Sequence, residues 1–336
     1  MHHHGLFPAT RLRRLRHNPN IRNLIKETNL HIEDLVLPLF IKQGTKIKNP
    51  IASMPGHFQF SVDNLEEEIN TIVECGIKSI ILFGIPTTKN ALGTEAYADN
   101  GVIQKAIPVI KKIAPDLLIM SDVCFCEYTD HGHCGITTEH HDVDNDKTLE
   151  ILAKQAISHA KSGADIIAPS GMIDGMVQAI RKGLDGEGLS HIPILSYSVK
   201  YASSLYGPFR EAAEGAPKFG DRRSHQTDYA NTHESIRECA LDIAEGADML
   251  MVKPAHTYLD IIFRIKQTYP SLPLGAYHTS GEFAMIKAAA EKGWIEERKT
   301  ALEILTSIRR AGADFIITYF AKEAAGWLHL STNIQD

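Results

Sequence analysis

Eight short apolar runs recur along this chain, and the stretches between them have the length and pattern of helices. The runs are nearly continuous in Ile, Val, Leu and Met, which is typical of parallel strands covered on both faces. We interpret them as strands at Leu35–Ile41, Ser79–Ile85, Leu117–Val123, Asp165–Pro169, Pro193–Val199, Met249–Lys253, Leu274–Thr279 and Phe315–Tyr319. Eight strands alternating with helices over about 300 residues predict an α/β fold, the (β/α)8 or TIM barrel.

A repeated tripeptide supports this interpretation. Gly-Ala-Asp follows Ser162, Glu245 and Ala311, and Cys75-Gly-Ile77 is a looser fourth copy. A glycine at this place suits the left-handed turn that ends a helix just before the next strand. A doubly wound open sheet is the alternative architecture. No Gly-x-Gly-x-x-Gly turn follows the first strand, so a dinucleotide-binding fold has little support.

The chain divides into an N-terminal arm at 1–30 and a barrel at 31–336. The arm carries a basic stretch interleaved with leucine at Arg11–Arg16, which favours packing on a neighbouring subunit, with a disordered tail as the alternative. His2–His4, either native residues or part of a tag, are set aside. The connection at about 201–231 is unusually long. Because it follows a strand, it should lie on the face that holds barrel active sites, and we predict that it is a lid.

Composition restricts the class of protein. The chain has 336 residues, 43% of them hydrophobic, which is enough for a large core. Its formal net charge of −6 gives no support to a nucleic-acid partner. No apolar run has the length of a membrane span, and we expect a cytoplasmic protein. The five cysteines fit a reducing compartment, with Cys75 and Cys239 in helical patterns as core residues.

Polar side chains stand at the ends of six predicted strands. A lysine at the mouth of an apolar strand is costly to hold as a cation, so its pKa should fall. The free amine is a nucleophile for carbonyl carbon, and two such lysines predict Schiff-base chemistry on two carbonyl substrates in one pocket. The strand-end set is Asp122, Cys124, Ser170, Lys200, Lys253, Tyr277, Ser280 and Tyr319.

Three cysteines within eleven positions, Cys124, Cys126 and Cys134, predict a zinc site. Three thiolates leave a fourth position for water or substrate, which is the pattern of a catalytic zinc. His131 or His133 would instead complete a closed structural site. Buried, reduced cysteines without a metal are the remaining alternative.

The predicted lid contains Arg210, Arg222 and Arg223 together with Gln226. Guanidinium groups on a loop over a pocket suit bidentate capture of a carboxylate. Ser280 and Tyr319 offer a second, neutral set of donors for another carboxylate.

Three long motifs resemble the porphobilinogen synthase family, also called 5-aminolevulinate dehydratases. They are Asp122–Gly135, Ser196–Arg210 and Met251–Pro254, and the likeness extends from Arg11–Arg16 to Arg310–Asp314. The resemblance implies a (β/α)8 barrel with an N-terminal arm, assembled as a homo-octamer. It also implies condensation of two molecules of 5-aminolevulinate to porphobilinogen with loss of two waters, in tetrapyrrole (haem) biosynthesis.

The resemblance implies roles for individual residues. Lys253 would form the Schiff base with the propionate-side substrate, and Lys200 the one with the acetate-side substrate. The ligands of the first carboxylate correspond to Ser280 and Tyr319, and those of the second to Arg210, Arg222 and Gln226. The pocket lining corresponds to Asp122, Ser170 and Tyr197, beside Tyr277. The zinc ligands correspond to Cys124, Cys126 and Cys134, and a glutamate that holds an allosteric magnesium in some members corresponds to Glu238. The chain departs from the usual pattern at Ser224-His225 and at His278-Thr279.

Three other functions share part of this pattern. A class I aldolase-type lyase needs only one Schiff-base lysine and no thiolate zinc. A zinc hydrolase leaves both lysines without a role. A zinc-stabilised barrel that serves as an interaction scaffold leaves the strand-end groups unexplained.

Overall fold

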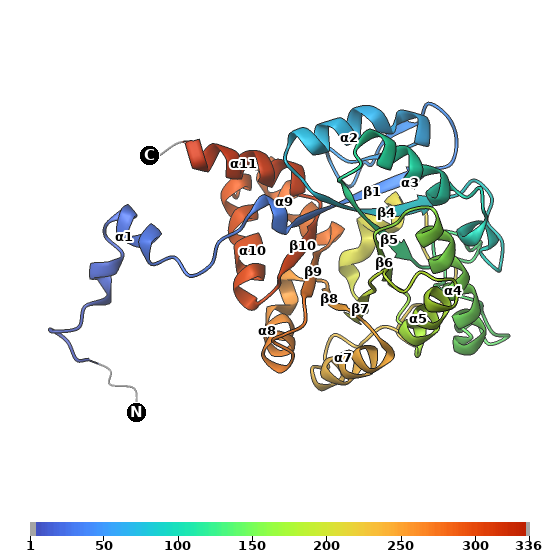
Figure 1. The fold of residues 1–336 in the computed structure, drawn as a ribbon. Helices are drawn as coiled ribbons and strands as arrows, with labels where there is room; N and C mark the ends of the chain where they lie inside the picture. Colours follow the sequence, from blue (N-terminus) through green and yellow to red (C-terminus); the bar gives the residue numbers. More distant parts are fainter. Residues whose placement is uncertain (1–4, 334–336) are drawn as a thin grey trace.

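The structure, a computed structural model, describes residues 5–333, and its centre is a ring of parallel strands (Figure 1). The order in space is β6-β5-β4-β1-β10-β9-β8-β7, and a parallel bridge between Ile167 and Ile194 joins the two ends. The sheet therefore closes on itself, and the predicted (β/α)8 barrel is confirmed. The strands are β1 (Leu35–Lys42), β4 (Ser79–Ile85), β5 (Leu118–Val123), β6 (Ile166–Pro169), β7 (Leu195–Lys200), β8 (Met249–Lys253), β9 (Leu274–His278) and β10 (Phe315–Thr318).

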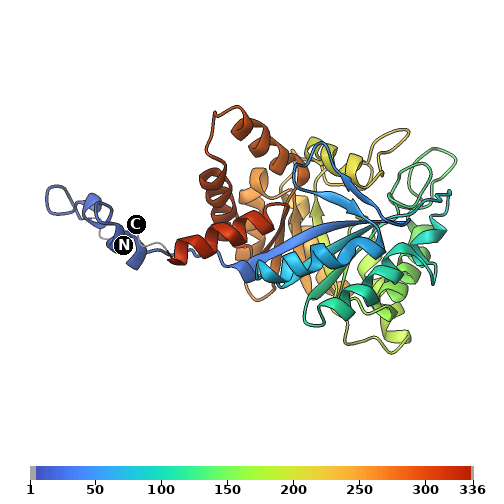
Figure 2. The same ribbon diagram turned by 90° about the horizontal axis from the view of Figure 1, so that it is seen from above.

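Helices surround this ring, as Figures 1 and 2 show from two directions. Each turns an apolar stripe toward the strands; in α3, Val102, Ala106 and Ile110 are buried at the spacing of one helix face. None of the helices described combines the length and apolarity needed to cross a bilayer. The outer helices are α2 (Leu65–Glu74), α3 (Val102–Ile113), α4 (Asn145–Lys161), α5 (Met176–Gly186), α7 (His233–Glu245), α8 (Leu259–Thr268), α9 (Ser280–Glu291), α10 (Glu297–Ala311) and α11 (Ala321–Asn333).

The Gly-Ala-Asp tripeptides do more than end helices. Their glycines have positive φ, for example 103° at Gly163 and 107° at Gly246, as predicted. In addition, each aspartate accepts a hydrogen bond from a backbone N–H at the start of the strand that precedes its helix. This bond joins consecutive strands of the barrel, which the sequence pattern did not predict. The bonds run from Ile119 to Asp165 (2.7 Å), from Ile194 to Asp248 (2.8 Å) and from Leu274 to Asp314 (2.7 Å).

Two short strands were missed. β2 (Lys48–Pro50) and β3 (Phe58–Phe60) form an antiparallel pair, and β3 also pairs with the end of β1. Each has three residues, which is too short for a periodicity to be read. Elsewhere the predicted strand limits lie within two residues of the observed ones. Cys239 is buried as predicted, whereas Cys75 is only half-buried.

The first part of the chain lies outside the barrel and projects away from it (Figures 1 and 2). It contains a 3-10 turn at Leu12–Leu15 and helix α1 (Pro19–Leu24). Its apolar side chains face solvent, with Leu6 at 80% and Leu24 at 84% exposure. His2–His4 lie outside the described residues.

Candidate active site

The two lysines predicted from the sequence lie side by side. Lys200 is the last residue of β7 and Lys253 the last of β8, and the two are paired in the parallel register of these strands. Both are buried, at 5% and 4% exposure. The barrel thus brings two amines from residues 53 positions apart to one place on its C-terminal face.

Aromatic rings surround the amine of Lys253. Its Nζ lies 4.1 Å from the ring centre of Tyr277, 5.1 Å from those of Tyr197 and Phe209, and 5.4 Å from that of Tyr206. Burial, reinforced by the positive charge of Lys200, lowers the pKa of Lys253 to about 7. A large fraction of this amine is therefore neutral, and nucleophilic, near pH 7.

A polar chain connects Lys200 with Asp122. Nζ of Lys200 donates to the carbonyl oxygen of Ser170 (2.6 Å), and Oγ of Ser170 donates to Oδ2 of Asp122 (3.1 Å). Burial, followed by the charge of Glu127, raises the pKa of Asp122 to about 7, although both lysines act in the opposite direction. Among the residues described, Oδ1 of Asp122 has no partner. A buried carboxyl of this kind can accept or donate a proton near pH 7.

The neutral donors lie on the next strands. The hydroxyls of Tyr277 and Tyr319 are 3.1 Å apart, and Tyr319 directly follows β10. Ser280 begins α9, and its Oγ accepts a hydrogen bond from the N–H of Phe209 (2.9 Å). Tyr197 is fully buried on β7. Tyr197 and Tyr277 therefore lie against the amine of Lys253, whereas Tyr319 is connected to it through Tyr277 and Ser280 through Phe209.

The three cysteines after β5 form one cluster. Their Sγ atoms lie within 4.8 Å of one another, with 3.5 Å between Cys124 and Cys126, and all three side chains are buried. A tetrahedral zinc with Zn–S bonds of about 2.3 Å needs sulfur atoms about 3.8 Å apart, so this donor set fits the ion. Within the described part of the chain, neither His131 nor His133 joins the cluster. Nε2 of His133 bonds instead to the carbonyl of Phe219 (3.0 Å).

The predicted lid residues lie over this centre. The 201–231 connection contains a 3-10 turn (Ser204–Tyr206) and helix α6 (Gly207–Ala212). The guanidinium of Arg222 donates to the carbonyls of Gly132 (2.9 Å) and Gly215 (2.7 Å), which ties the connection to the cysteine loop. Burial lowers the pKa of Arg222, but Cys134, Cys126 and Cys124 in their thiolate form raise it, and the guanidinium stays charged.

Two cavities meet at Arg222. An outer one of about 770 Å³ is lined by Arg210, Arg222 and Gln226. An inner one of about 10 Å³ is lined by Lys200, Lys253 and Ser170 together with Arg222. The inner space holds about one water molecule, so this conformation is closed to a larger ligand.

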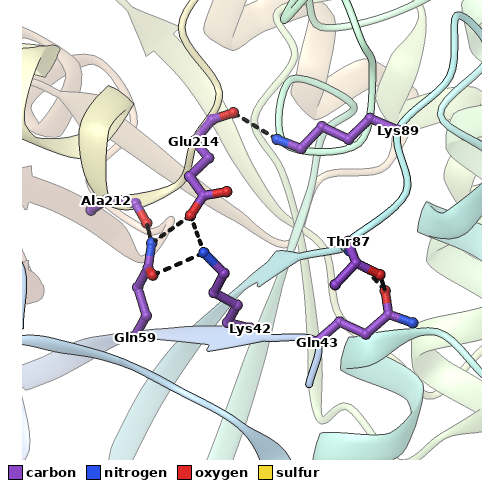
Figure 3. A network of polar contacts seen from close by, with 7 residues as sticks. All are labelled: Lys42, Gln43, Gln59, Thr87, Lys89, Ala212 and Glu214. Atoms are coloured by element: carbon purple, nitrogen blue, oxygen red, sulfur yellow. Dashed lines mark hydrogen bonds and ion pairs between the residues drawn. The ribbon is translucent and has the colours of Figure 1, made fainter. Parts of the chain in front are cut away.

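A polar network anchors the middle of the connection to the opposite side of the barrel (Figure 3). The carboxylate of Glu214 forms an ion pair with Lys42 at the end of β1 and accepts from Nε2 of Gln59 (3.2 Å). Gln59 also donates to the carbonyl of Ala212 (2.7 Å), and Lys89 to that of Glu214 (2.6 Å). Two segments of the barrel, β1 with β3 and the loop after β4, therefore hold residues 212–214.

Residues that the sequence did not single out also line the inner cavity: Phe83, Glu127, Tyr206 and Phe209. Tyr206 donates to the carbonyls of Tyr201 (2.7 Å) and Lys253 (3.2 Å). Tyr206 ends a 3-10 turn and Phe209 lies in the six-residue helix α6, and both elements are too short for a periodicity to assign a direction to a side chain. Glu127 lies between Cys126 and Cys134 in the sequence, and the cysteine spacing predicts a metal site without assigning a role to it.

Glu238 lies away from this centre. It is on α7 and lines a cavity of about 810 Å³ with Asp174, Asp242 and Glu234, and this cavity borders the outer cavity at Arg223 and Gln226. Burial, together with the charges of Asp242 and Asp174, raises the pKa of Glu238 to about 7. The structure therefore separates this residue from the lysines and cysteines. Of the two departures from the family pattern, Ser224 donates to Asp142 (2.6 Å) and His278 lies 3.2 Å from the hydroxyl of Thr318.

A closed barrel that collects amines, a carboxylic acid and thiols at one end of its strands belongs to the catalytic (β/α)8 barrels. Comparison with known proteins narrows this class. The family model described as Delta-aminolevulinic acid dehydratase matches residues 9–327. The chain therefore belongs to the delta-aminolevulinic acid dehydratase family, whose members are lyases.

Individual relatives agree over nearly the whole chain. The Delta-aminolevulinic acid dehydratase of Halalkalibacterium halodurans is 52% identical over 319 residues, covering 95% of this chain and 97% of its own. That of Synechocystis sp. is 53% identical over 327 residues, covering 96% and 99%. The crystal structure of the Toxoplasma gondii ME49 enzyme with its reaction product porphobilinogen has a TM-score of 0.94 and 43% identity, covering 97% of this chain and 95% of that one.

Proposed function

We propose that this lyase joins two molecules of 5-aminolevulinate to one porphobilinogen and two waters through imines on Lys253 and Lys200. The observation that carries the proposal is the register of β7 and β8, which pairs the two lysines at the strand ends. Two ketones bound to neighbouring amines react as parts of one molecule, which removes much of the entropic cost of a bimolecular condensation.

The first imine is assigned to Lys253 because its pKa of about 7 leaves the amine free to attack. Nζ adds to the ketone carbon of the first substrate, and the ketone oxygen leaves as water with the two amine protons. The resulting imine, once protonated, acidifies the adjacent carbon. Asp122, with a pKa near 7 and an unshared oxygen among the described residues, is suited to move protons at this step.

The carboxylates of the two substrates are assigned to different sets of donors. Ser280 and Tyr319 suit the first, because they belong to the barrel and bond to Phe209 and Tyr277, whose rings lie against Lys253. Arg210, Arg222 and Gln226 suit the second, because they line the outer cavity and come from the connection. The inner cavity of about 10 Å³ is too small for substrate, so the 201–231 connection acts as a lid that opens for entry.

Cys124, Cys126 and Cys134 would hold zinc, and their geometry supports this assignment. Bound there, zinc would supply a Lewis acid that helps to bind and orient the second substrate. Glu238 lines an acidic cavity around α7 that contains neither lysine and none of the three cysteines, which suits a regulatory magnesium site. The exposed apolar arm supports contacts between subunits, in an assembly that the family resemblance makes an octamer.

The deciding experiment is a colorimetric assay of porphobilinogen formed from 5-aminolevulinate, combined with borohydride trapping. Borohydride reduction with substrate should attach it covalently to Lys253, located by mass spectrometry. Lys253→Arg keeps a long basic side chain but forms no imine, so turnover and the label at position 253 should be lost while circular dichroism is unchanged. Lys182→Arg, an exposed change on α5, is the matched control.

Each rival function gives a different outcome. Label on one lysine without porphobilinogen indicates an aldolase-type enzyme. Zinc-dependent hydrolysis without any label indicates a hydrolase, and neither activity indicates a scaffold. Wild-type turnover in Lys253→Arg would contradict the imine assignment.

A further inference from the structure

Glu282 is a buried carboxylate that the chemistry above does not use. It lies in the first turn of α9 and is 1% exposed. Its two oxygens accept from four donors: the N–H groups of Ala255 (3.5 Å), His256 (2.5 Å) and Thr279 (2.5 Å), and the hydroxyl of Thr279 (2.9 Å). Burial raises the pKa of Glu282 to about 7, although these donors act in the opposite direction.

Half of these bonds are those of an ordinary helix start. Thr279 is the residue before α9, and a glutamate in the first turn often bonds back to that position. The bonds to Ala255 and His256 are different, because these residues lie 27 and 26 positions away and belong to the loop after β8. Glu282 therefore joins two separate strand ends of the barrel.

Both strand ends carry residues of the site. Ala255 and His256 follow Lys253 and Pro254 directly, and Thr279 immediately precedes Ser280. We propose that Glu282 is a positioning residue that fixes the distance between the imine-forming amine of Lys253 and the carboxylate-binding hydroxyl of Ser280. This inference rests on the roles proposed above for those two residues.

The chemistry of the side chain explains why an acid is needed. Four donors converge on Glu282, and a carboxylate has only acceptor atoms. A glutamine of the same shape has one oxygen, and its NH2 group would face backbone N–H groups on one side. Oε1 accepts from His256 alone, whereas Oε2 accepts from Ala255 and from both groups of Thr279. With the glutamine oxygen in the place of Oε2, the loop after β8 would lose its short bond from His256 and keep only the 3.5 Å bond from Ala255, while Thr279 kept both of its bonds.

The test compares two ketones that differ in their carboxylate. 4-Oxopentanoate and 2-pentanone both form an imine, but only the first carries the group that Ser280 is proposed to bind. The ratio of their borohydride trapping rates at Lys253 measures whether the amine and the carboxylate donor are held at the right distance from one another. In Glu282→Gln this ratio should fall about ten- to hundredfold while trapping of 2-pentanone is unchanged, because small misplacements have effects of that size.

Further variants separate positioning from general damage. Ser280→Ala should lower the same ratio, and the double variant should lower it no further, since both changes remove one interaction. Glu291→Gln, at the exposed end of the same helix, should leave the ratio at the wild-type value. Circular dichroism verifies that each variant is folded. Should Glu282→Gln not fold, Glu282→Asp keeps the charge at the helix start with a shorter reach, and its ratio should fall partway.

The outcomes distinguish this inference from the function on which it rests. No labelling of Lys253 in the wild-type protein overturns both. Labelling in the wild type, with an unchanged ratio in a folded Glu282 variant, overturns the positioning role alone and leaves Glu282 as a helix cap.

Discussion

At the scale of single residues, the site depends on holding an amine where a cation is disfavoured. The ring of Tyr277 lies 4.1 Å from Nζ of Lys253, close enough for a favourable cation–π contact, yet burial and Lys200 outweigh it and lower the pKa. The charge of Asp122 raises the pKa of Lys253 and keeps it near 7. The amine is therefore balanced between its two protonation states at neutral pH.

This balance predicts the pH dependence of imine formation. As pH rises from about 6 to about 8 through the pKa of about 7, the neutral fraction of Lys253 grows, and borohydride trapping should become faster. Asp122→Asn removes a charge that raises the pKa of Lys253, so the midpoint should move to lower pH. Rapid-quench trapping at fixed ionic strength measures both. A trapping rate that does not change over this range would contradict the assignment.

At the scale of elements, the 201–231 connection and the cysteine loop are packed against one another. A Cβ on Gly132 would lie 2.2 Å from the carbonyl oxygen of Ala216, so the two backbones touch. The ring of Phe219 lies 4.6 Å from that of His133, and the N–H of Lys218 donates to the carbonyl of His131 (3.0 Å). Movement of the connection therefore requires separation from the loop that carries the thiols.

Arg210 offers the cleaner test of the connection, since Arg222 also supports the backbone. Nε of Arg210 has no hydrogen-bond partner among the described residues and is free for a carboxylate. Arg210→Ala should remove a charge-assisted pair of about 1.5–3 kcal/mol and raise the apparent KM about ten- to hundredfold. Labelling of Lys253 should persist. Arg264→Ala, exposed on α8, is the control, and equal loss of labelling in Arg210→Ala would show that the connection also serves the first substrate.

The cysteine loop gives a prediction about metal removal. The barrel has a large core of its own, so it does not need a metal to fold. Chelation should abolish porphobilinogen formation, leave circular dichroism nearly unchanged and be reversed by zinc. Magnesium alone should fail to restore porphobilinogen formation, since hard cations prefer oxygen ligands to thiolates. Cys126→Ala should behave like the chelated protein and Cys75→Ala like the wild type, whereas unfolding on chelation would favour a structural site.

At the scale of the whole molecule, the arm is the part that a single chain leaves without contacts. Deletion of residues 1–30 removes exposed apolar side chains such as Leu12 and Leu24, at 68% and 84% exposure, and should reduce the assembly to a smaller one. Multi-angle light scattering measures the mass. Leu12→Ser with Leu24→Ser should act in the same direction without shortening the chain. An unchanged mass in both variants would contradict the role of the arm.

The fold was largely predictable because strands that are buried on both faces appear in the sequence as continuous apolar runs. Glycines also mark the ends of the helices that precede β4, β6, β8 and β10. The lysines were predictable for the same reason: a charge directly after such a run stands out. Glu282 and Tyr206 were not, since their partners lie 26 and 47 residues away and no local pattern records them. Long-range hydrogen bonds form only when the barrel closes, and the sequence of a single segment does not predict which distant residues closure brings together.

The anchoring of Glu214 has a consequence for the order in which the two substrates arrive. It divides the long connection into two shorter loops, and a shorter loop has less conformational freedom. The first loop carries Arg210 and stays near the barrel, whereas Arg222 and Gln226 belong to the second. The donors for the first carboxylate, Ser280 and Tyr319, belong to the barrel rather than to the connection. We therefore expect an ordered reaction, in which the molecule bound to Lys253 enters first and the second site is completed only when the outer loop closes over it.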